Sequence, residues 1–315
     1  MIDHKSERRV LVVHNPKSSH ASNVQRDVFD RLREDGVKYE SFSTPSPDAT
    51  DNIDAIAATL REDDTVLSVG GDGTALQVAN GVRVAGVAGV KLGILNLGNF
   101  GDGAHNFHIP AARRDPLPVL EAQDRTVAVR PLEIMVNDEY WRSTLLYATL
   151  GWTAMAAHQF DNPKIREQLQ HGAANLPLTL GRLVLYYFKT RHEGVLPLFS
   201  RDGDDGGEPV TDIMAVSGRY VAGFMKMRHD KTGDLDFLSR DLDVSGLTKN
   251  SSFLTASTLG YMPGTMKASD TLLFKEPASV PIQLDGEFTL LENVSKLQIR
   301  KSPELPTLQV ITTRR

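Results

Sequence analysis

The first third of the chain alternates short apolar runs with segments whose apolar residues recur at helical spacing. Strands separated by helices of ten to fifteen residues imply right-handed crossovers and a parallel sheet with helices on its faces. We therefore expect an α/β domain in this part of the chain. The predicted strands are residues 10–13, 38–44, 65–71 and 91–98, and the predicted helices are residues 24–36, 48–62 and 74–82.

The pattern changes after Pro110, where a connecting segment leads to strand-like runs without regular helices between them. These runs are residues 127–137, 140–151 and 212–223. We expect a mostly antiparallel second domain with one helical insertion at about residues 153–192. The predicted division is an α/β domain over residues 1–125 and a β-rich domain over residues 126–299, with the tail of residues 300–315 packing back on the first domain.

Composition narrows the classes of function. The chain has 315 residues, enough for two domains, and 35 Lys and Arg against 40 Asp and Glu give a net charge of −5. No globally basic surface is available for nucleic acid, so we expect no nucleic-acid partner. The absence of cysteine excludes disulfides, thiolate nucleophiles and Cys-ligated zinc, and favours a reducing, cytoplasmic compartment. The N-terminus lacks the pattern of a signal peptide, and residues 183–188 form too short an apolar run to span a bilayer, so any membrane contact is expected to be peripheral.

The sequence Gly70-Gly71-Asp72-Gly73-Thr74 joins a predicted strand directly to a predicted helix. Glycines let backbone N–H groups approach an anion, and a helix N-terminus adds partial positive charge at the same point. Asp72 alone would repel a phosphate, so it indicates a divalent cation, Mg²⁺, or a water between carboxylate and phosphate. The alternative is a tight strand-to-helix turn with an Asp or Thr cap.

On these residues the chain resembles the superfamily that unites diacylglycerol and other lipid kinases with NAD kinases. GGDGT is the shared signature, Asn15 and Pro16 match the turn after the first strand, and Thr44 matches a Thr after the second. The resemblance implies a Rossmann-like parallel-sheet domain, an antiparallel β-sandwich domain, ATP and Mg²⁺ as cofactors, and Asp72 as the residue that organises the metal. The residues implied to hold ATP are Asn15, Pro16, Thr44, Gly70, Gly71, Asp72, Gly73, Thr74, Gly98 and Asn99.

Asp285-Gly286-Glu287 resembles the DGE triplet of bacterial lipid kinases, whose acidic residues are implicated in deprotonating the acceptor hydroxyl. The resemblance implies that this turn faces GGDGT across a cleft, with Asp285 or Glu287 as the base. Phosphoryl transfer does need a carboxylate within hydrogen-bond reach of the attacking hydroxyl. The alternative is an ordinary hairpin turn, because Asp-Gly between apolar strands is a strong turn signal.

Three functions remain open. Residues 149–152 and 218–226 resemble the lipid kinase branch, which implies a lipid or lipid-like hydroxyl as the acceptor, whereas residues 96–101 and 299–303 resemble the NAD kinase branch. Lipid kinases usually carry Gly-Thr-x-Asn-Asp where this chain has Gly98-Asn99-Phe100-Gly101-Asp102, so Asn99 replaces the Thr and Gly101 the Asn. Because of this departure, the third hypothesis is a protein that binds a nucleotide but has lost catalysis. The sequence does not distinguish a monomer from a homodimer.

Overall fold

The computed structural model describes most of the N-terminal half and the long C-terminal hairpin. The described residues are 9–18, 21–44, 46, 48–97, 101–109, 115–160, 196, 199–201, 212–217, 220–221, 225–226, 238–242, 265–266, 269–301 and 308–313. The chain forms two compact units. Residues 1–130 and 304–315 make the first, and residues 131–303 make the second.

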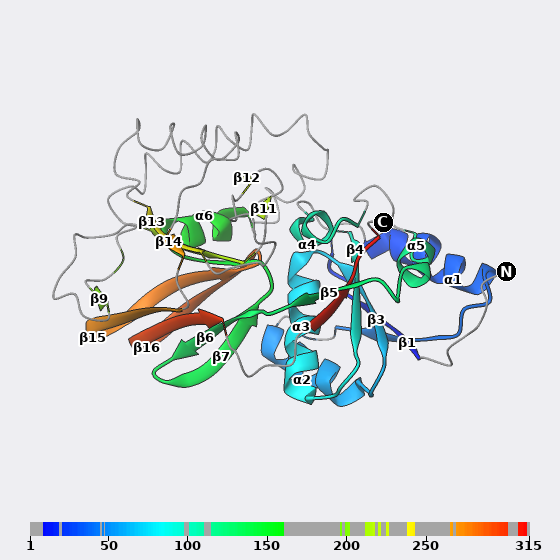
Figure 1. Ribbon diagram of the computed structural model, residues 1–315, viewed down its shortest axis with the longest axis horizontal. Helices are drawn as coiled ribbons and strands as arrows, with labels where there is room; N and C mark the ends of the chain where they lie inside the picture. Colours follow the sequence, from blue (N-terminus) through cyan, green and yellow to red (C-terminus); the bar gives the residue numbers. More distant parts are fainter. Residues whose placement is uncertain are drawn as a thin grey trace. The chain divides into compact units, whose positions relative to one another are not determined.

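A six-stranded sheet is the centre of the first unit, in the order β2-β1-β3-β4-β17-β5 (Figure 1). All neighbouring strands are parallel except β17 and β5, which are antiparallel. Every residue of β3 is buried, as expected for a central strand that is covered on both faces. The strands are β1 (Val10–His14), β2 (Tyr39–Ser43), β3 (Thr65–Gly70), β4 (Lys91–Asn96), β5 (Thr126–Val129) and β17 (Leu308–Ile311).

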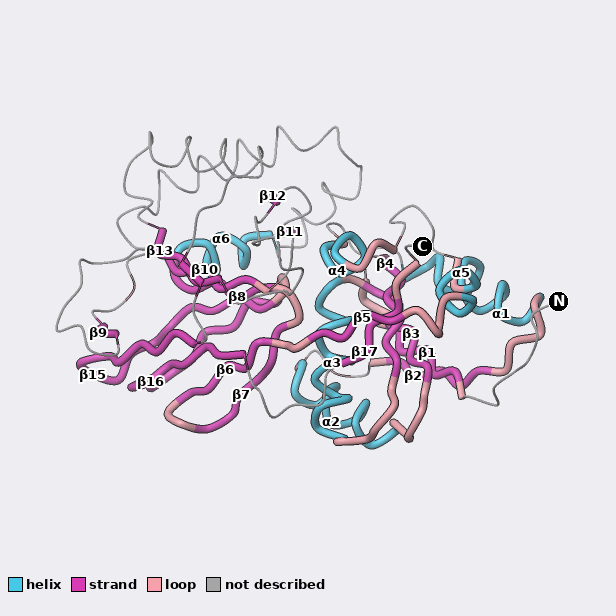
Figure 2. Tube along the Cα trace, in the orientation of Figure 1, coloured by secondary structure: helices cyan, strands magenta, loops and turns pink. Residues whose placement is uncertain are grey.

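Helices lie on both sides of this sheet, with α2, α3 and α4 on one side and α1 and α5 on the other (Figure 2). Asp48 caps α2 by accepting a hydrogen bond from the Thr50 N–H at 2.7 Å, and Gly86 ends α3 in the left-handed region at φ 62°. The helices are η1 (Ala21–Asn23), η2 (Gln25–Asp30), α1 (Arg31–Glu34), α2 (Ala49–Thr59), α3 (Asp72–Ala85), α4 (Asp102–Asn106) and α5 (Leu117–Glu121).

The helix predicted over residues 24–36 is present, but its first part, η2, is a π-helix. Within it, the Phe29 ring stacks on Tyr39 with centroids 5.5 Å apart and meets His14 edge-on at 5.4 Å. Burial lowers the pKa of His14. The aromatic contacts link η2 to the first two strands, which helical periodicity alone does not reveal.

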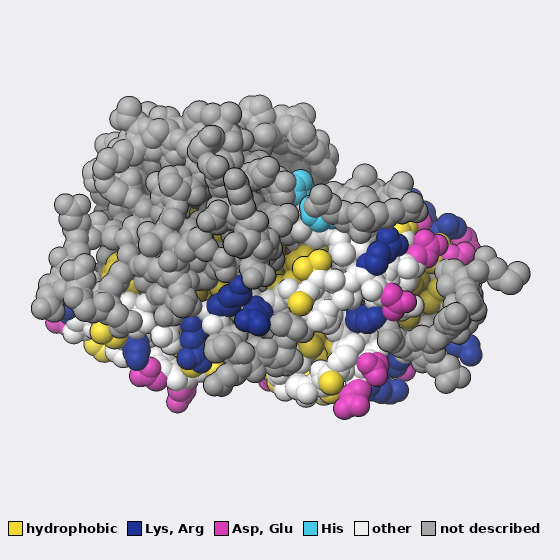
Figure 3. Space-filling view, viewed as in Figure 1, with side chains coloured by type: hydrophobic (Ala, Val, Ile, Leu, Met, Phe, Trp, Pro, Cys, Tyr) yellow, Lys and Arg dark blue, Asp and Glu magenta, His cyan; other side chains and the backbone are white. Residues whose placement is uncertain are grey.

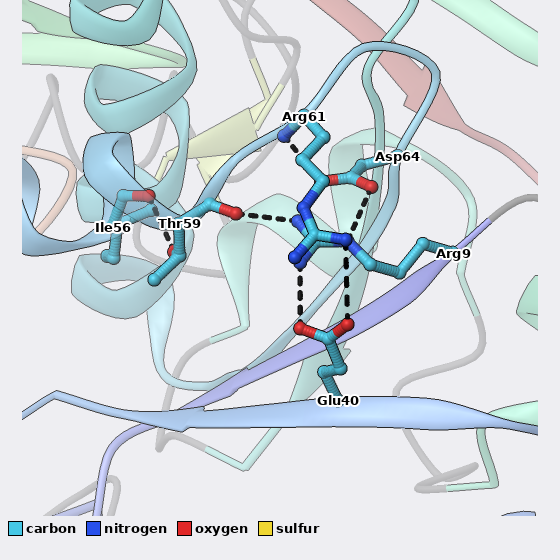
Figure 4. Close-up of polar contacts among 6 residues, drawn as sticks. All are labelled: Arg9, Glu40, Ile56, Thr59, Arg61 and Asp64. Carbon is cyan, nitrogen blue, oxygen red and sulfur yellow. Dashed lines mark hydrogen bonds and ion pairs between the residues drawn. The ribbon is translucent and has the colours of Figure 1, made fainter.

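A network of charged side chains connects the strands of this sheet near the amino ends of β1 and β3 (Figure 4). The Arg9 guanidinium donates to both Asp64 carboxylate oxygens, at 2.9 and 2.5 Å, and to Glu40 at 2.8 Å. It also donates to the Thr59 carbonyl at 2.6 Å, while the Arg61 N–H donates to Asp64. Asp64 is fully buried, and its carboxylate raises the pKa of Arg9. The network therefore holds the first residues of β3 against the first residues of β1.

Arg9→Met is expected to lower the free energy of unfolding of the first unit by about 3 kcal/mol, because it leaves the buried Asp64 carboxylate without its cation. Urea unfolding followed by circular dichroism measures this. Glu40→Gln is the matched control, since Glu40 is exposed and exposed ion pairs contribute at most about 1 kcal/mol. If both variants lost the same unfolding free energy, the ion pair between Arg9 and the buried Asp64 would not be the source of this stability.

The second unit is built on a nine-stranded antiparallel sheet. Eight strands follow the order β14-β13-β10-β8-β15-β16-β6-β7, and β9 pairs with β15. Helix α6 contacts β8, β15 and β16. Of the helical insertion expected over residues 153–192, the part after residue 160 lies outside the described residues. The expected fold class, a parallel-sheet α/β domain followed by an antiparallel β domain, is confirmed.

The elements of the second unit are β6 (Leu132–Val136), β7 (Glu139–Thr144), β8 (Tyr147–Gly151), α6 (Trp152–Phe160), β9 (Phe199–Arg201), β10 (Asp212–Val216), β11 (Tyr220–Val221), β12 (Met225–Lys226), β13 (Leu238–Leu242), β14 (Thr265–Met266), β15 (Ser269–Leu284) and β16 (Glu287–Lys301). The strands β11 and β12 form a separate two-stranded sheet.

Charged side chains of both signs are interspersed over the described surface that Figure 3 shows. This agrees with the nearly balanced composition of the chain. Among the described helices, none combines the length and the apolar character needed to cross a bilayer.

Candidate active site at the carboxyl edge of the first sheet

Three of the predicted nucleotide-binding segments, together with Asn96 at the end of β4, lie at one edge of the first sheet. The strand β2 lies on one side of β1, and β3 lies on the other, so the chain changes direction between β1 and β3. In open α/β sheets, such a switch point forms the ligand crevice at the carboxyl ends of the strands. The segments there are Asn15-Pro16 after β1, Thr44 after β2, residues 70–74 after β3 and Asn96 at the end of β4.

Backbone hydrogen bonds hold these segments in register. The Asn15 N–H donates to the Val69 carbonyl at 3.3 Å, and the Thr44 N–H donates to the His14 carbonyl at 3.0 Å. The Leu97 N–H donates to the Gly70 carbonyl at 2.6 Å. The turn after β3 is thus linked to the strands on both of its sides.

The Asn15-Pro16 turn has its own local support. The Asn15 side-chain oxygen accepts a hydrogen bond from the Lys17 N–H at 2.8 Å, which forms an Asx turn. Pro16 is exposed, whereas Thr44 is buried. The roles of Asn15, Pro16 and Thr44 toward a nucleotide stay predictions.

Close packing explains the glycine at position 70, the first of the turn after β3. A Cβ on Gly70 would lie 2.3 Å from Thr74 Oγ1 and 2.8 Å from Thr74 Cβ. Thr74 is buried and branched at Cβ, so it cannot easily move aside. The Gly71 backbone is extended at the N-cap of α3, and no side chain caps this helix. The start of this 14-residue helix carries the partial positive charge that favours an anion.

The Asp72 carboxylate bridges to the next loop. One oxygen accepts a hydrogen bond from the Gly103 N–H at 2.8 Å, and the other accepts one from the Asp102 N–H at 3.1 Å. Burial raises the pKa of Asp72 above its ordinary value, although the N–H bonds to the carboxylate act in the opposite direction. Asp72 thus holds the start of α4 beside the start of α3.

Gly101, at the N-cap of α4, has φ 66°, and a Cβ there would lie 1.8 Å from Asn96 Nδ2. A side chain at position 101, where lipid kinases usually have Asn, would therefore require the Asn96 amide to move. The neighbouring Gly98 and Asn99, predicted to contact the nucleotide, lie outside the described residues. Asp102, which the sequence retains from the family loop, is buried beside Asp72, and sequence reasoning gave it no role.

Asp72 is the carboxylate predicted to bind Mg²⁺ at this edge. Among the described residues, no group of three or more His, Asp or Glu side chains could hold a metal ion. Mg²⁺ is usually bound by one or two carboxylates together with substrate phosphates, so it does not need such a group. The Asp72 carboxylate accepts hydrogen bonds from the N–H groups of Asp102 and Gly103, and the N–H groups of Gly101 and Asp72 itself also act on it to lower its pKa. Asp72 as the metal-organising residue stays a prediction.

The second unit carries the DGE turn between β15 and β16. Asp285 and Gly286 have φ 45° and 96°, as a two-residue hairpin turn requires. Asp285 Oδ1 accepts hydrogen bonds from the N–H groups of Leu146 and Tyr147, at 3.0 and 2.9 Å, and Oδ2 accepts one from Leu145 at 2.7 Å. The expected approach of this turn to GGDGT joins residues of two units and stays a prediction.

Asp285 is 2% exposed, and its burial raises the pKa to about 6. Because the folded pKa lies above the ordinary value of 3.8, the folded state binds this proton more readily, so the stability contributed by Asp285 rises as the pH falls from about 6 toward 4.

The difference in unfolding free energy between the wild-type chain and Asp285→Asn is therefore expected to increase by about 1 kcal/mol from pH 7 to pH 5. Urea titrations of both proteins at the two pH values measure it. A difference that is independent of pH would contradict the raised pKa.

Comparisons with known proteins agree with this architecture. Residues 9–132 match the sequence model of the family described as "Diacylglycerol kinase catalytic domain". A crystal structure described as a diacylglycerol kinase from Bacillus anthracis str. Sterne is similar, with a TM-score of 0.67, 16% identity and 98% of each chain covered. A second structure from that strain, of a proposed diacylglycerol kinase, gives a TM-score of 0.65 at 15% identity, again with 98% of each chain covered. No curated protein matches the chain.

Proposed function

Because residues 9–132 match the sequence model of the diacylglycerol kinase catalytic domain, we propose that this chain transfers the γ-phosphoryl group of ATP to a hydroxyl of a lipid or lipid-like acceptor. The observation that carries the proposal is the glycine turn of residues 70–74, which opens the uncapped helix α3 at the switch point of the sheet.

Different residues at this edge bind different parts of ATP. The first N–H groups of α3 donate to phosphate oxygens, and Gly70 lets the phosphates approach the backbone. Asn15 and Thr44, after the two neighbouring strands, bind the remainder of the nucleotide. Asp72 would hold Mg²⁺, which supplies neutralisation of phosphate charge when it is bound.

The acceptor must lose a proton as its oxygen attacks phosphorus. A carboxylate of the 285–287 turn takes this proton in the proposal, as the DGE resemblance implies. The lipid class of the acceptor is supported by the family that the first unit matches.

Incubation of the purified chain with Mg²⁺ and ATP labelled in its γ-phosphate tests the proposal. Parallel reactions contain short-chain diacylglycerol in detergent micelles, NAD or no acceptor. We expect label to enter the diacylglycerol arm at least about tenfold faster than the other two. Label in NAD would favour a nucleotide acceptor. Tight ATP binding without transfer to any acceptor would favour a binding protein.

A further inference from the structure

The Asn52 side chain, on α2, binds the chain that follows β2. Its Oδ1 accepts a hydrogen bond from the Ser46 N–H at 3.0 Å, and its Nδ2 donates one to the Ser46 carbonyl at 2.9 Å. The same Nδ2 donates to Gln77 Oε1, on α3, at 3.2 Å. Both N–H groups of the amide therefore have acceptors, in a residue that is 3% exposed. One buried amide thus connects the residue two positions after Thr44 with α3.

The contact between α2 and α3 supports these bonds. Asn52 and Ile56 lie one turn apart on α2, and Gln77 and Gly81 lie one turn apart on α3, so each pair shares a helix face. A Cβ on Gly81 would lie 2.7 Å from Ile56 Cγ2, and Ile56 is fully buried. The two helices therefore approach closely beside the Asn52 amide, which limits the movement of that amide.

Thr44 is held from its other side by β1. Its N–H donates to the His14 carbonyl at 3.0 Å, and the residue is buried. The turn of residues 70–74 opens α3, the helix that carries Gln77. The chain after β2 and the turn after β3 are therefore both attached to α3, one through the Asn52 amide and the other directly. Their relative position is set by contacts within the first unit.

We infer that Asn52 is a positioning residue for ATP and that Gln77 is its partner, an inference that rests on the proposed function. Asn52 holds the chain after β2 so that Thr44 is in place before the nucleotide binds. A site that is already ordered does not lose affinity to the entropy cost of ordering it. Because Asn52 acts through Thr44, whereas the turn of residues 70–74 binds the phosphates, its loss should weaken ATP binding and leave kcat nearly unchanged.

Four variants test this role. Asn52→Ala removes all three hydrogen bonds, whereas Asn52→Asp keeps an acceptor for the Ser46 N–H and removes both donors. Gln77→Met keeps a side chain of similar length without the acceptor, and the fourth variant combines Asn52→Ala with Gln77→Met. The control is Asn80→Ala, which removes another buried amide of α3, one whose Nδ2 donates to the Leu76 carbonyl at 2.9 Å.

For Asn52→Ala we expect Kd and KM for ATP to rise about tenfold, with kcat at saturating ATP within about twofold of wild type. Asn52→Asp should recover part of the affinity, and Gln77→Met should raise Kd about threefold. The double variant should match Asn52→Ala, because the bond that Gln77→Met removes is already absent there. Asn80→Ala should keep the wild-type Kd even where its Tm falls. Calorimetry with ATP and steady-state kinetics measure these values, at a temperature where circular dichroism shows each variant to be folded.

The outcomes separate this inference from the proposed function. Wild-type Kd in Asn52→Ala, a fall in kcat without a rise in KM, or an equal rise of Kd in Asn80→Ala would overturn the positioning role. If Asn52→Ala does not fold, unchanged Kd in both Asn52→Asp and Gln77→Met would overturn it instead. Effects that multiply in the double variant would remove Gln77 as the partner.

A wild-type chain that binds ATP without transfer to any acceptor would overturn the proposed function alone, because the Kd values still decide the role of Asn52. A wild-type chain that does not bind ATP would overturn both.

Discussion

Gly70→Ala is expected to lower ATP-dependent phosphoryl transfer by about 10³-fold. The new Cβ would lie 2.3 Å from Thr74 Oγ1, and Thr74 is buried in the first turn of α3. Either Thr74 or the turn must move, and both changes displace the N–H groups proposed to bind phosphate. Steady-state kinetics with varied ATP measure the loss, and an increase in Kd for ATP, measured by calorimetry, should accompany it.

Gly86→Asn is the control for this substitution. Gly86 ends the same helix with positive φ, no other atom lies within 4 Å of the Cβ position, and Asn tolerates the left-handed region. Its turnover should equal that of the wild-type chain. Gly70→Ala with normal Kd for ATP and normal kcat would show that the turn does not hold the nucleotide.

Asp72→Ala is expected to reduce kcat by about 10³-fold and the free energy of unfolding by about 2 kcal/mol. The substitution leaves the N–H groups of Asp102 and Gly103 without their acceptor and releases the start of α4. It also removes the carboxylate proposed to organise Mg²⁺. Turnover at several Mg²⁺ concentrations and urea unfolding measure the two effects.

Asp72→Asn separates the effects, because an amide oxygen still accepts one of the two N–H bonds. We expect it to recover part of the stability and little of the turnover, because the amide NH2 group faces the second N–H donor. Asp54→Ala, at an exposed position of α2, is the control and should change neither. Full activity in Asp72→Asn would limit Asp72 to its structural contact with α4.

The local patterns of the sequence were enough to predict the turn after β3, because its glycines and its strand and helix are all adjacent in the chain. The same local patterns predicted the strands β1 to β4. They did not reveal that Asp72 binds the backbone of residues 102 and 103, because those partners lie about 30 positions away. A carboxylate in a glycine turn is equally consistent with a metal-binding role and with a structural cap of the turn.

The contacts of Asp285 also involve residues distant in the chain, so local sequence patterns do not predict them. The Asp-Gly pair predicts a hairpin turn, and the DGE resemblance predicts a base. Neither pattern indicates that the Asp285 carboxylate accepts hydrogen bonds from the N–H groups of residues 145–147. Likewise β5 lies in a run that reads as the start of the second domain, yet it pairs with β17 of the first sheet, from the far end of the chain. Such pairings depend on the folded topology and leave no mark on local periodicity.

A crystal structure of the chain with Mg²⁺ and a non-hydrolysable ATP analogue tests the central claim most directly. We expect phosphate oxygens within about 3 Å of the N–H groups at the start of α3. Nucleotide bound away from residues 70–74, in crystals whose solution contains saturating ATP analogue, would contradict it.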